Sequence, residues 1–314
     1  MTRHLTGEVA LELVCDGLGF PEGPVWMRDG SVLVVEIDPR RLSRVNSCGA
    51  RTTVATFERG APNGAAIGPD GAVYVCNNGG MRFADLPGGG RVPVGAAPDH
   101  AGGSIDRVDL ATGAVTTVYR TCGDVGLNSP NDLVFDRNGG FWFTDIGRKL
   151  ATGHDPGRVY YARPDGSAIR LIRDGMLSPN GIGLSPAGDR LYIAETTTSR
   201  VWVHEVTAPG RIAAAPSMWL PGEVLGPLPG YQLLDSLAVD ADGNICAATL
   251  INGGITVFAS DGTTTRHFPT PDFATTNICF GGDDLQHAWI TASSTGRLYR
   301  ARWPRPGLPL AFSA

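Results

Sequence analysis

A strand–turn–strand unit recurs six times along this chain of 314 residues. Each copy has an apolar residue, a polar turn and a short run of β-branched and aromatic residues, as in IGPDGAVYVCNN and FDRNGGFWFTDI. Asp-Gly and Asn-Gly pairs favour hairpin turns because both residues tolerate positive φ. The runs that follow are too short for helices and are typical of strands. The turn positions are Gly30, Gly71, Gly139, Gly188, Gly243 and Asp284.

The spacing of these turns predicts the architecture. By subtraction, the intervals from Gly30 to Gly71 and from Gly243 to Asp284 are both 41 residues. A period of about 40–50 residues with strand–turn–strand content is typical of a propeller blade. The chain is long for one ordinary core, but six blades would close into one ring. We therefore predict an all-β fold, a six-bladed β-propeller that forms a single domain over residues 1–314.

One interval is longer than the others. Gly71 and Gly139 are 68 residues apart, and the excess falls in a stretch rich in Gly, Pro and Ala at about 82–104. This stretch is predicted to be a long inserted loop, and loops of that length in compact folds are usually functional or disordered. Either it covers the channel mouth, with Arg82, Phe83 and His100 as substrate contacts, or it is a surface insertion.

Composition and motifs exclude several classes of function. The formal net charge of −5 gives no basic surface for nucleic acid, and no apolar run of 18 or more residues predicts a transmembrane helix. No secretion signal is recognised at the start, so we expect a cytoplasmic protein without nucleic-acid or membrane partners. The sequence has no G-x-S-x-G, H-E-x-x-H, P-loop or dinucleotide-binding motif, and its six histidines share no metal-ligand spacing. The oligomeric state is left open.

The six cysteines are spread along the chain and form no C-x-x-C pair. A zinc ribbon or a dithiol redox site is therefore not indicated. We expect six reduced thiols, most of them buried in strands, and keep one structural disulfide as the alternative. The cysteines are Cys15, Cys48, Cys76, Cys122, Cys246 and Cys279.

Oxygen-bearing side chains stand in equivalent places, a few residues before the hairpins. In a propeller the equivalent points of the blades face the common axis, so residues far apart in the chain would converge there. Carboxylate and amide oxygens are hard ligands that suit Ca²⁺, Mg²⁺ or Mn²⁺. The alternative is that Pro-Asn-Gly is only a turn, but three Pro-Asn pairs in register with the repeat argue against it. The residues are Glu22, Asn63, Asn131, Asn180 and Asp235.

These motifs resemble the senescence marker protein/gluconolactonase/luciferin-regenerating-enzyme family, which includes regucalcin. The resemblance covers essentially the whole chain and is carried by PEGPVW, SPNDLVFD with GGFWFTD, SPNGIGLSP with LYIAET, and DSLAVDADGN. It implies a six-bladed propeller with one divalent cation at the axis, Ca²⁺ first, with Zn²⁺, Mn²⁺, Mg²⁺ or Fe²⁺ as alternatives. It implies Glu22, Asn180 and Asp235 as metal ligands, Asn131 as a contact to metal or substrate, and Asp132 beside it.

The family resemblance implies lactone hydrolysis, with Asp235 as general base. Asp132 is the second candidate for the base, and the alternative is that it only holds Asn131 or the loop backbone. Asn131 and Asn63 would orient the substrate by hydrogen bonds. Ser129 and Pro130 stand where relatives that act on sugar lactones often carry an arginine, which argues against a polyhydroxylated substrate.

Two alternatives to the lactonase stay open at this stage. PNDLVF, PNGIGL and IAETTT are also similar to phosphotriesterase-type propellers, so an esterase or phosphotriesterase at the same metal is one alternative. A non-catalytic calcium-binding or ligand-binding propeller is the other. In each case the partner is a small molecule, a lactone or ester for the enzymes.

Overall fold

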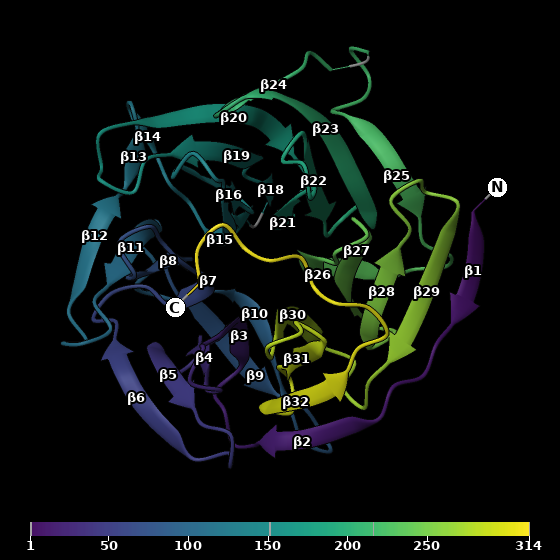
Figure 1. Ribbon diagram of the computed structural model, residues 1–314. Coiled ribbons are helices and arrows are strands. Elements are labelled where there is room, and N and C mark those ends of the chain that lie inside the picture. The colour runs from purple at the N-terminus through teal and green to yellow at the C-terminus, as the bar shows by residue number, and fades with distance from the viewer. Residues whose placement is uncertain (1, 151, 216, 314) are drawn as a thin grey trace.

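The computed structural model describes residues 2–150, 152–215 and 217–313. All helices and strands that could be assigned in these residues are β-strands, with no helix among them. Six sheets are arranged as blades around a central axis (Figure 1). The predicted six-bladed β-propeller is therefore confirmed. No helix that could span a membrane occurs in the described part of the chain.

Each blade is a meander whose first strand lies at the axis. Blade 1 has β3 (Pro21–Trp26), β4 (Val32–Glu36), β5 (Arg41–Val45) and β6 (Arg51–Thr56). Blade 2 has β7 (Pro62–Ile67), β8 (Val73–Asn77), β11 (Ser104–Val108) and β12 (Val115–Tyr119). Blade 3 has β15 (Pro130–Phe135), β16 (Phe141–Asp145), β19 (Gly157–Ala162) and β20 (Ile169–Met176).

The second half of the ring repeats this order. Blade 4 has β21 (Pro179–Leu184), β22 (Arg190–Glu195), β23 (Arg200–Ala208) and β25 (Glu223–Pro227), with the short β24 (Arg211–Ile212) beside β23. Blade 5 has β26 (Leu233–Val239), β27 (Ile245–Leu250), β28 (Gly254–Phe258) and β29 (Thr264–Pro269). Blade 6 has β30 (Thr275–Gly281), β31 (His287–Ala292) and β32 (Arg297–Arg302).

The N-terminal strands complete the ring. The outermost strand of blade 6 is β2 (Leu11–Cys15), which pairs antiparallel with β32. Upstream of it, β1 (Arg3–Thr6) adds a fifth, parallel strand to blade 5 through β29. The start of the chain therefore holds its last blade, and the ring closes without a free gap between blades 6 and 1.

The predicted turns connect the first two strands of each blade. At the first five turns the glycine has a φ between 74° and 82° and donates its N–H to the carbonyl three residues earlier. At the sixth turn this role belongs to Leu285, with a φ of 54° and an N–H to the Gly282 carbonyl, so the predicted position Asp284 is wrong by one residue. Asp284 instead accepts the N–H of Gln286 through its side chain.

The inserted segment contains an ordered hairpin. β9 (Met81–Asp85) and β10 (Arg91–Ala96) pair antiparallel, so part of the stretch predicted as a loop is a β-ribbon. Phe83 packs against Phe20 before β3, with ring centroids 5.0 Å apart. At its far end the N–H of Arg91 donates to the Ser294 carbonyl of blade 6 at 2.9 Å. Two shorter hairpins pair β13 (Thr121–Cys122) with β14 (Val125–Gly126), and β17 (Lys149–Leu150) with β18 (Gly153–His154).

The hydrophobic core is distributed between the blades. Six buried clusters each join two neighbouring blades, as where Phe143 of blade 3 belongs to one cluster with Tyr74 of blade 2. Because both faces of each sheet are covered, second strands such as β4 and β16 are buried at every position and have almost continuous apolar sequences. The six cysteines form no disulfide, and three of them are buried.

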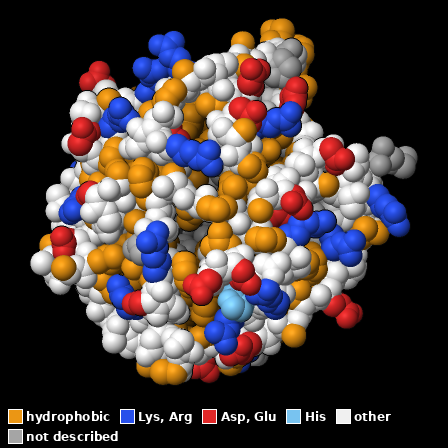
Figure 2. Space-filling model, in the orientation of Figure 1, with side chains coloured by type: hydrophobic (Ala, Val, Ile, Leu, Met, Phe, Trp, Pro, Cys, Tyr) orange, Lys and Arg blue, Asp and Glu red, His pale blue; other side chains and the backbone are white. Residues whose placement is uncertain are grey.

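The C-terminal segment crosses the front of the ring in Figure 1. The Leu308 N–H donates to the Val239 carbonyl, and Phe312 packs edge-on against Phe135. Beneath it lies a mainly apolar cavity of about 490 Å³ in the central channel. Hydrophobic side chains run across the centre of this face (Figure 2).

Candidate functional site

The predicted ligands lie on the innermost strands, at the end of the channel opposite the C-terminal segment. All five side chains are nearly buried, with exposed fractions between 3% and 9%. The two Pro-Asn-Gly tripeptides begin strands β7 and β21, so they are not turns. The structure places Glu22 on β3, Asn63 on β7, Asn131 on β15, Asn180 on β21 and Asp235 on β26.

The strand register is irregular at this layer in every blade. In each blade the pairing of the first and second strands shifts at the site residue or directly after it. Examples are the shifts between Glu22 and Val25 and between Pro130 and Leu133. A β-bulge redirects side chains and strengthens local twist, and bulges are common beside active sites. Six equivalent bulges therefore aim six short segments at the axis.

Two glycines explain the Asn-Gly pairs. A Cβ atom on Gly64 would lie 2.4 Å from the Asn131 carbonyl oxygen, and one on Gly181 would lie 2.5 Å from the backbone nitrogen of Leu237. Neighbouring inner strands are thus too close at this depth for any side chain. The glycines therefore let neighbouring inner strands approach closely at this depth.

Three carboxyl groups on the inner strands, those of Glu22, Asp132 and Asp235, lie close enough for their charges to interact. Burial raises the pKa of Glu22 to about 7, against the opposing hydrogen bonds of Asn277, Thr276 and Gly23. Burial raises the pKa of Asp235 well above its usual range, and the charges of Glu22 and Asp132 add to the shift. Burial also raises the pKa of Asp132 to about 7, with a further contribution from Glu22. The protein alone thus leaves the negative charge at this site uncompensated.

The donor set fits a hard divalent cation. The Oδ1 atom of Asn131 is buried and lacks a hydrogen-bond partner within the described residues, which is unusual for an amide oxygen. A cation at the axis would satisfy this oxygen and remove the repulsion between the carboxylates. In the described ranges no three His, Cys, Asp or Glu side chains form a metal cluster, and the predicted set of four contains two amides. Glu22, Asn131, Asn180 and Asp235 are the residues that would hold the ion.

Asp132 also faces the axis. On a regular strand, neighbouring residues point to opposite sides, which would turn Asp132 away from Asn131. The bulge in β15 breaks this alternation, and the Asp132 carboxyl group interacts with Ser236 of blade 5 and the backbone of Ile182 in blade 4. Asp132 therefore lies close to Asn131 on the channel side and stays a candidate for the base.

The sixth blade contributes residues that the sequence analysis missed. Thr276 on β30 is equivalent to Glu22, and the next residue, Asn277, donates its side-chain amide to Glu22 Oε2 at 3.0 Å. The N–H of Gly23 donates to the same oxygen at 3.1 Å. These bonds fix the Glu22 carboxylate. Counting back from the sixth turn would have found Thr276, but its segment lacks the Pro-Asn signal.

A second missed set anchors the site loops. In four blades the last residue of the second strand accepts a backbone N–H from the loop two or three residues before the site residue. The sequence signal was a polar residue after each apolar run, as in LVVE and FWFTD. The pairs are Glu36 with Gly19, Asn77 with Ala61, Asp145 with Ser129, and Glu195 with Leu177, at 2.7–2.9 Å.

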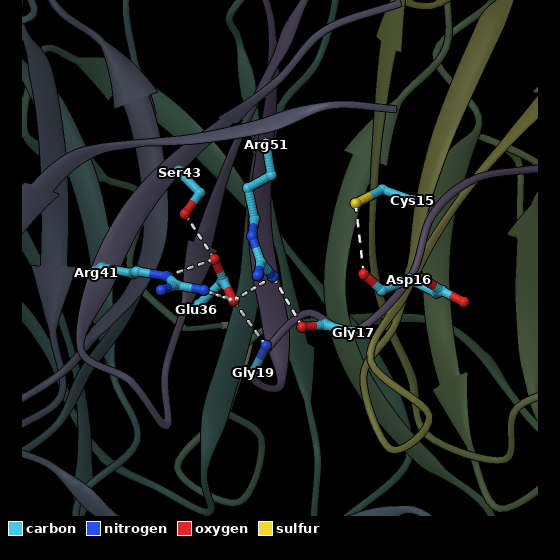
Figure 3. Close-up of polar contacts among 8 residues, drawn as sticks. All are labelled: Cys15, Asp16, Gly17, Gly19, Glu36, Arg41, Ser43 and Arg51. Atoms are coloured by element: carbon cyan, nitrogen blue, oxygen red, sulfur yellow. Dashed lines mark hydrogen bonds and ion pairs between the residues drawn. The ribbon is translucent and has the colours of Figure 1, made fainter. Parts of the chain in front are cut away.

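Glu36 shows how strongly such an anchor is held (Figure 3). Its carboxylate accepts hydrogen bonds from Arg41 at 2.8 and 2.9 Å and from Ser43 at 2.6 Å, and Arg51 lies 3.4 Å away. Burial alone would raise the pKa of Glu36, but the bonds from Arg41, Ser43 and Gly19 bring it below its ordinary value. The charged form is therefore favoured by folding, and it ties the loop before Glu22 to blade 1.

Replacing Glu36 by alanine is expected to lower the free energy of unfolding by about 1.5–3 kcal/mol at pH 7, because charge-assisted bonds are lost. The pKa of Glu36 is lowered on folding, so its contribution is present above the unfolded value and is lost as the pH falls below about 4.5. Urea denaturation at pH 7 and pH 3.5 measures both effects. Glu36→Gln, which keeps one acceptor oxygen, should lose less, and equal stability of wild type and Glu36→Ala at pH 7 would refute the anchor role.

The remaining predicted contacts lie in the inserted segment. Arg82 is exposed on β9, and Phe83 is half-buried against Phe20. His100 is half-buried and close-packed on Gly79, whose added Cβ would lie 2.4 Å from His100 Nε2. The hairpin does extend over the face that carries the site, since it reaches Ser294 of blade 6. Substrate contact by Arg82 and His100 stays a prediction.

The cavity of about 490 Å³ in the channel does not coincide with the layer formed by Glu22, Asn131, Asn180 and Asp235, the ligand layer. Its walls come from the other ends of the inner strands. At its inner end it is lined by Gly23, Asp132 and Asn277, each of which follows a site position by one residue. Glu22, Asn131, Asn180 and Asp235 do not line it. The interacting carboxyl groups and the unpaired Asn131 amide oxygen belong to the ligand layer and its immediate neighbours.

Comparison with known proteins places the chain in a family. The model of the SMP-30/gluconolactonase/LRE-like region matches residues 20–294. The chain belongs to this family. It is 25% identical over 306 residues to a gluconolactonase of Zymomonas mobilis, covering 90% of this chain and 79% of that one. It is 28% identical over 262 residues to lactonase drp35 of Staphylococcus haemolyticus, covering 83% and 72%.

A solved structure shows the same architecture. The calcium-binding protein regucalcin of Agrobacterium tumefaciens superimposes with a TM-score of 0.74 at 19% identity, over 99% of this chain and 100% of that one. At this identity the likeness supports the fold alone. The predicted class, hydrolases that act on ester bonds, is confirmed by the relatives of the chain, since gluconolactonase and lactonase are enzymes of this class.

Proposed function

We propose that the protein is a lactonase that opens a lactone ring at one divalent cation held by Glu22, Asn131, Asn180 and Asp235. The observation that carries the proposal is the buried layer of carboxylate and amide oxygens on the inner strands. Burial raises the pKa values of Glu22 and Asp235, and the charges of Glu22 and Asp132 add to the shift of Asp235. An all-oxygen donor set favours Ca²⁺. The named gluconolactonase and lactonase relatives support the choice of substrate bond.

Such a cation, when bound, polarises the lactone carbonyl and stabilises the negative charge that develops on its oxygen. The amide groups of Asn131 and Asn63 hold the ester oxygens by hydrogen bonds and set the ring against the attacking water. Asn180 donates to Thr196 Oγ1 at 3.2 Å and hydrogen-bonds to Asp235, so it fixes the orientation of the base. Positioning of this kind lowers the entropy cost of the reaction.

Asp235 takes the proton from the water as the water oxygen bonds to the carbonyl carbon. The ring C–O bond then breaks, and the departing alcohol oxygen takes back the proton from the Asp235 carboxyl group. One water is consumed for each ring opened, and the product is a hydroxy acid. Asp132, one residue after Asn131 and also at the axis, is the alternative base.

Proton release during lactone hydrolysis, followed with a pH indicator, tests the proposal. The protein as purified should hydrolyse lactones, lose activity with a chelator and regain it when Ca²⁺ or another divalent ion is restored. Metal analysis of the same preparation should find about one divalent ion per chain, as expected for a single site of this ligand count. Metal binding without hydrolysis of any lactone would favour the non-catalytic alternative instead.

A further inference from the structure

The rim around the candidate site has two chemically different halves. The loops of blades 4–6 on this face, all described, contain one charged residue, Asp272. Arg200 and Arg297 directly follow two of these loops, and Arg200 donates to the Thr198 carbonyl at 3.1 Å. Asp272 is 2% exposed and accepts bonds from the backbone of Ala274 and from Thr295, so it offers no charge to solvent. These loops comprise residues 177–178, 196–199, 228–232, 251–253, 270–274 and 293–296.

The loops of blades 1–3 on the same face are charged. They carry ion pairs between Arg40 and Asp99, between Arg91 and both Asp38 and Asp85, and between Arg148 and Asp155. The rim therefore carries many charges over blades 1–3 and few over blades 4–6.

Large apolar side chains are exposed on the half formed by blades 4–6. Leu177, Tyr231, Ile251 and Phe273 have exposed fractions of 50%, 75%, 48% and 44%. Leu177 precedes Asn180 by three residues, and Tyr231 precedes Asp235 by four, so the chain leads directly from these side chains into the ligand layer. The Ile251 N–H donates to the Phe273 carbonyl at 2.8 Å, which joins the loops of blades 5 and 6.

The backbone at Ile251 has an uncommon conformation. Its φ is +73°, which is a genuine outlier for a β-branched residue. Ser178 and Ser199, in the neighbouring loops of blade 4, also have positive φ, at 60° and 55°, but so do Phe20 and Arg40 at the equivalent positions of blade 1, at 53° and 54°. Ile251 is therefore the position that distinguishes this half of the rim. Strained residues of this kind cluster at ligand sites, because the surrounding structure must hold them. At Ile251 the strain accompanies an apolar side chain that is left open to solvent.

We infer that the substrate carries an uncharged, apolar substituent, an alkyl chain or aryl ring, that lies on Leu177, Tyr231, Ile251 and Phe273 while the lactone ring lies over the ligand layer. This inference rests on the proposed lactonase function. A charged lactone substituent would find few charged side chains on this half of the rim. The loops do carry hydroxyl groups, such as those of Ser178 and Thr197, so what they lack is charge. Each methylene buried there is worth roughly fourfold in kcat/KM.

Three δ-lactones of one ring size test the inference: δ-valerolactone without a substituent, δ-decalactone with a five-carbon chain, and the polyhydroxylated glucono-δ-lactone. With Ca²⁺ present, kcat/KM for δ-decalactone should exceed that for both others by at least about tenfold, from a few buried methylenes. A higher kcat/KM for glucono-δ-lactone would overturn the inference while leaving the lactonase proposal standing. Hydrolysis of none of the three would instead count against the lactonase itself.

A pair of leucine variants locates the preference. Leu177→Ser should reduce the ratio of kcat/KM for δ-decalactone to that for δ-valerolactone by about three- to tenfold, the value of one lost apolar contact. Leu13→Ser is the matched control, since Leu13 is 47% exposed on the outer strand β2, and the ratio should stay as in wild type. Phe273→Ser repeats the test at a second position. An unchanged ratio in both site variants, or a dimer in sedimentation that Leu177→Ser dissociates, would show that this surface serves another purpose.

Discussion

Replacing Asp235 by asparagine is expected to lower kcat for lactone hydrolysis by about 10²–10⁴-fold, the usual contribution of a general base. Asparagine keeps an oxygen for a cation and for the hydrogen bond with Asn180, and it has nearly the same volume in a position that is 9% exposed. What it removes is the ability to accept a proton from water. The fold and a measurable metal content should therefore survive while turnover is lost.

Asp132→Asn is the matched comparison for Asp235→Asn. Both side chains are buried at the axis and both are affected by the charge of Glu22, so the two changes remove similar charge from similar surroundings. The loss in kcat should be much larger for Asp235→Asn if Asp235 is the base. Metal content of each variant should be measured beside kcat. An Asp235→Asn protein with full metal and near-normal turnover would assign the base to Asp132 or to another group.

Much of the fold could be predicted because propeller blades repeat local signals. Turn pairs such as Asp70-Gly71 and Asn138-Gly139 act within a few residues, and the same hairpin is built each time. The sixth turn was misplaced because its left-handed position is a leucine, Leu285, and Asp284 beside it is a common turn residue. Nothing in the composition marks a leucine as the residue with positive φ.

The candidate site was partly predictable for the same reason. Position relative to the hairpin is a repeat property, so Glu22, Asn63, Asn131, Asn180 and Asp235 could be brought to the axis from spacing alone. Their distances from one another depend on the bulges and on the contact between neighbouring inner strands, which no single blade encodes.

Other features depend on contacts between distant segments. Asn277 reaches Glu22 only because the ring closes blade 6 against blade 1. The hairpin of β9 and β10 is held by Phe20 and Ser294, and the apolar half of the rim combines loops from three blades. Sequence patterns within one repeat do not contain these partners.

Replacing Glu22 by glutamine is expected to weaken divalent-metal affinity by about 100-fold or more, since changes even to residues that only support metal ligands typically cost about 10–100-fold. The neutral amide keeps an oxygen but loses the negative charge that attracts the ion. Without metal, the Glu22→Gln protein should nevertheless be more stable than wild type at pH 8. In the folded wild type the pKa of Glu22 is raised to about 7, so ionising this carboxylate above pH 7 opposes folding.

The sign of this effect follows from proton binding. Between the ordinary pKa of 4.5 and about 7, folded wild type holds more protons than unfolded chain, so its stability falls as the pH rises through this window. Glutamine removes that fall, which leaves the metal-free variant more stable at pH 8 by on the order of 2–3 kcal/mol. Excess Ca²⁺ stabilises a protein in proportion to the logarithm of its affinity and should reverse the order. Thermal melts at pH 8 with chelator and with Ca²⁺ measure the crossing, with Glu12→Gln on exposed β2 as the control. If Ca²⁺ raises the melting temperature of wild type and Glu22→Gln equally, Glu22 is not a ligand.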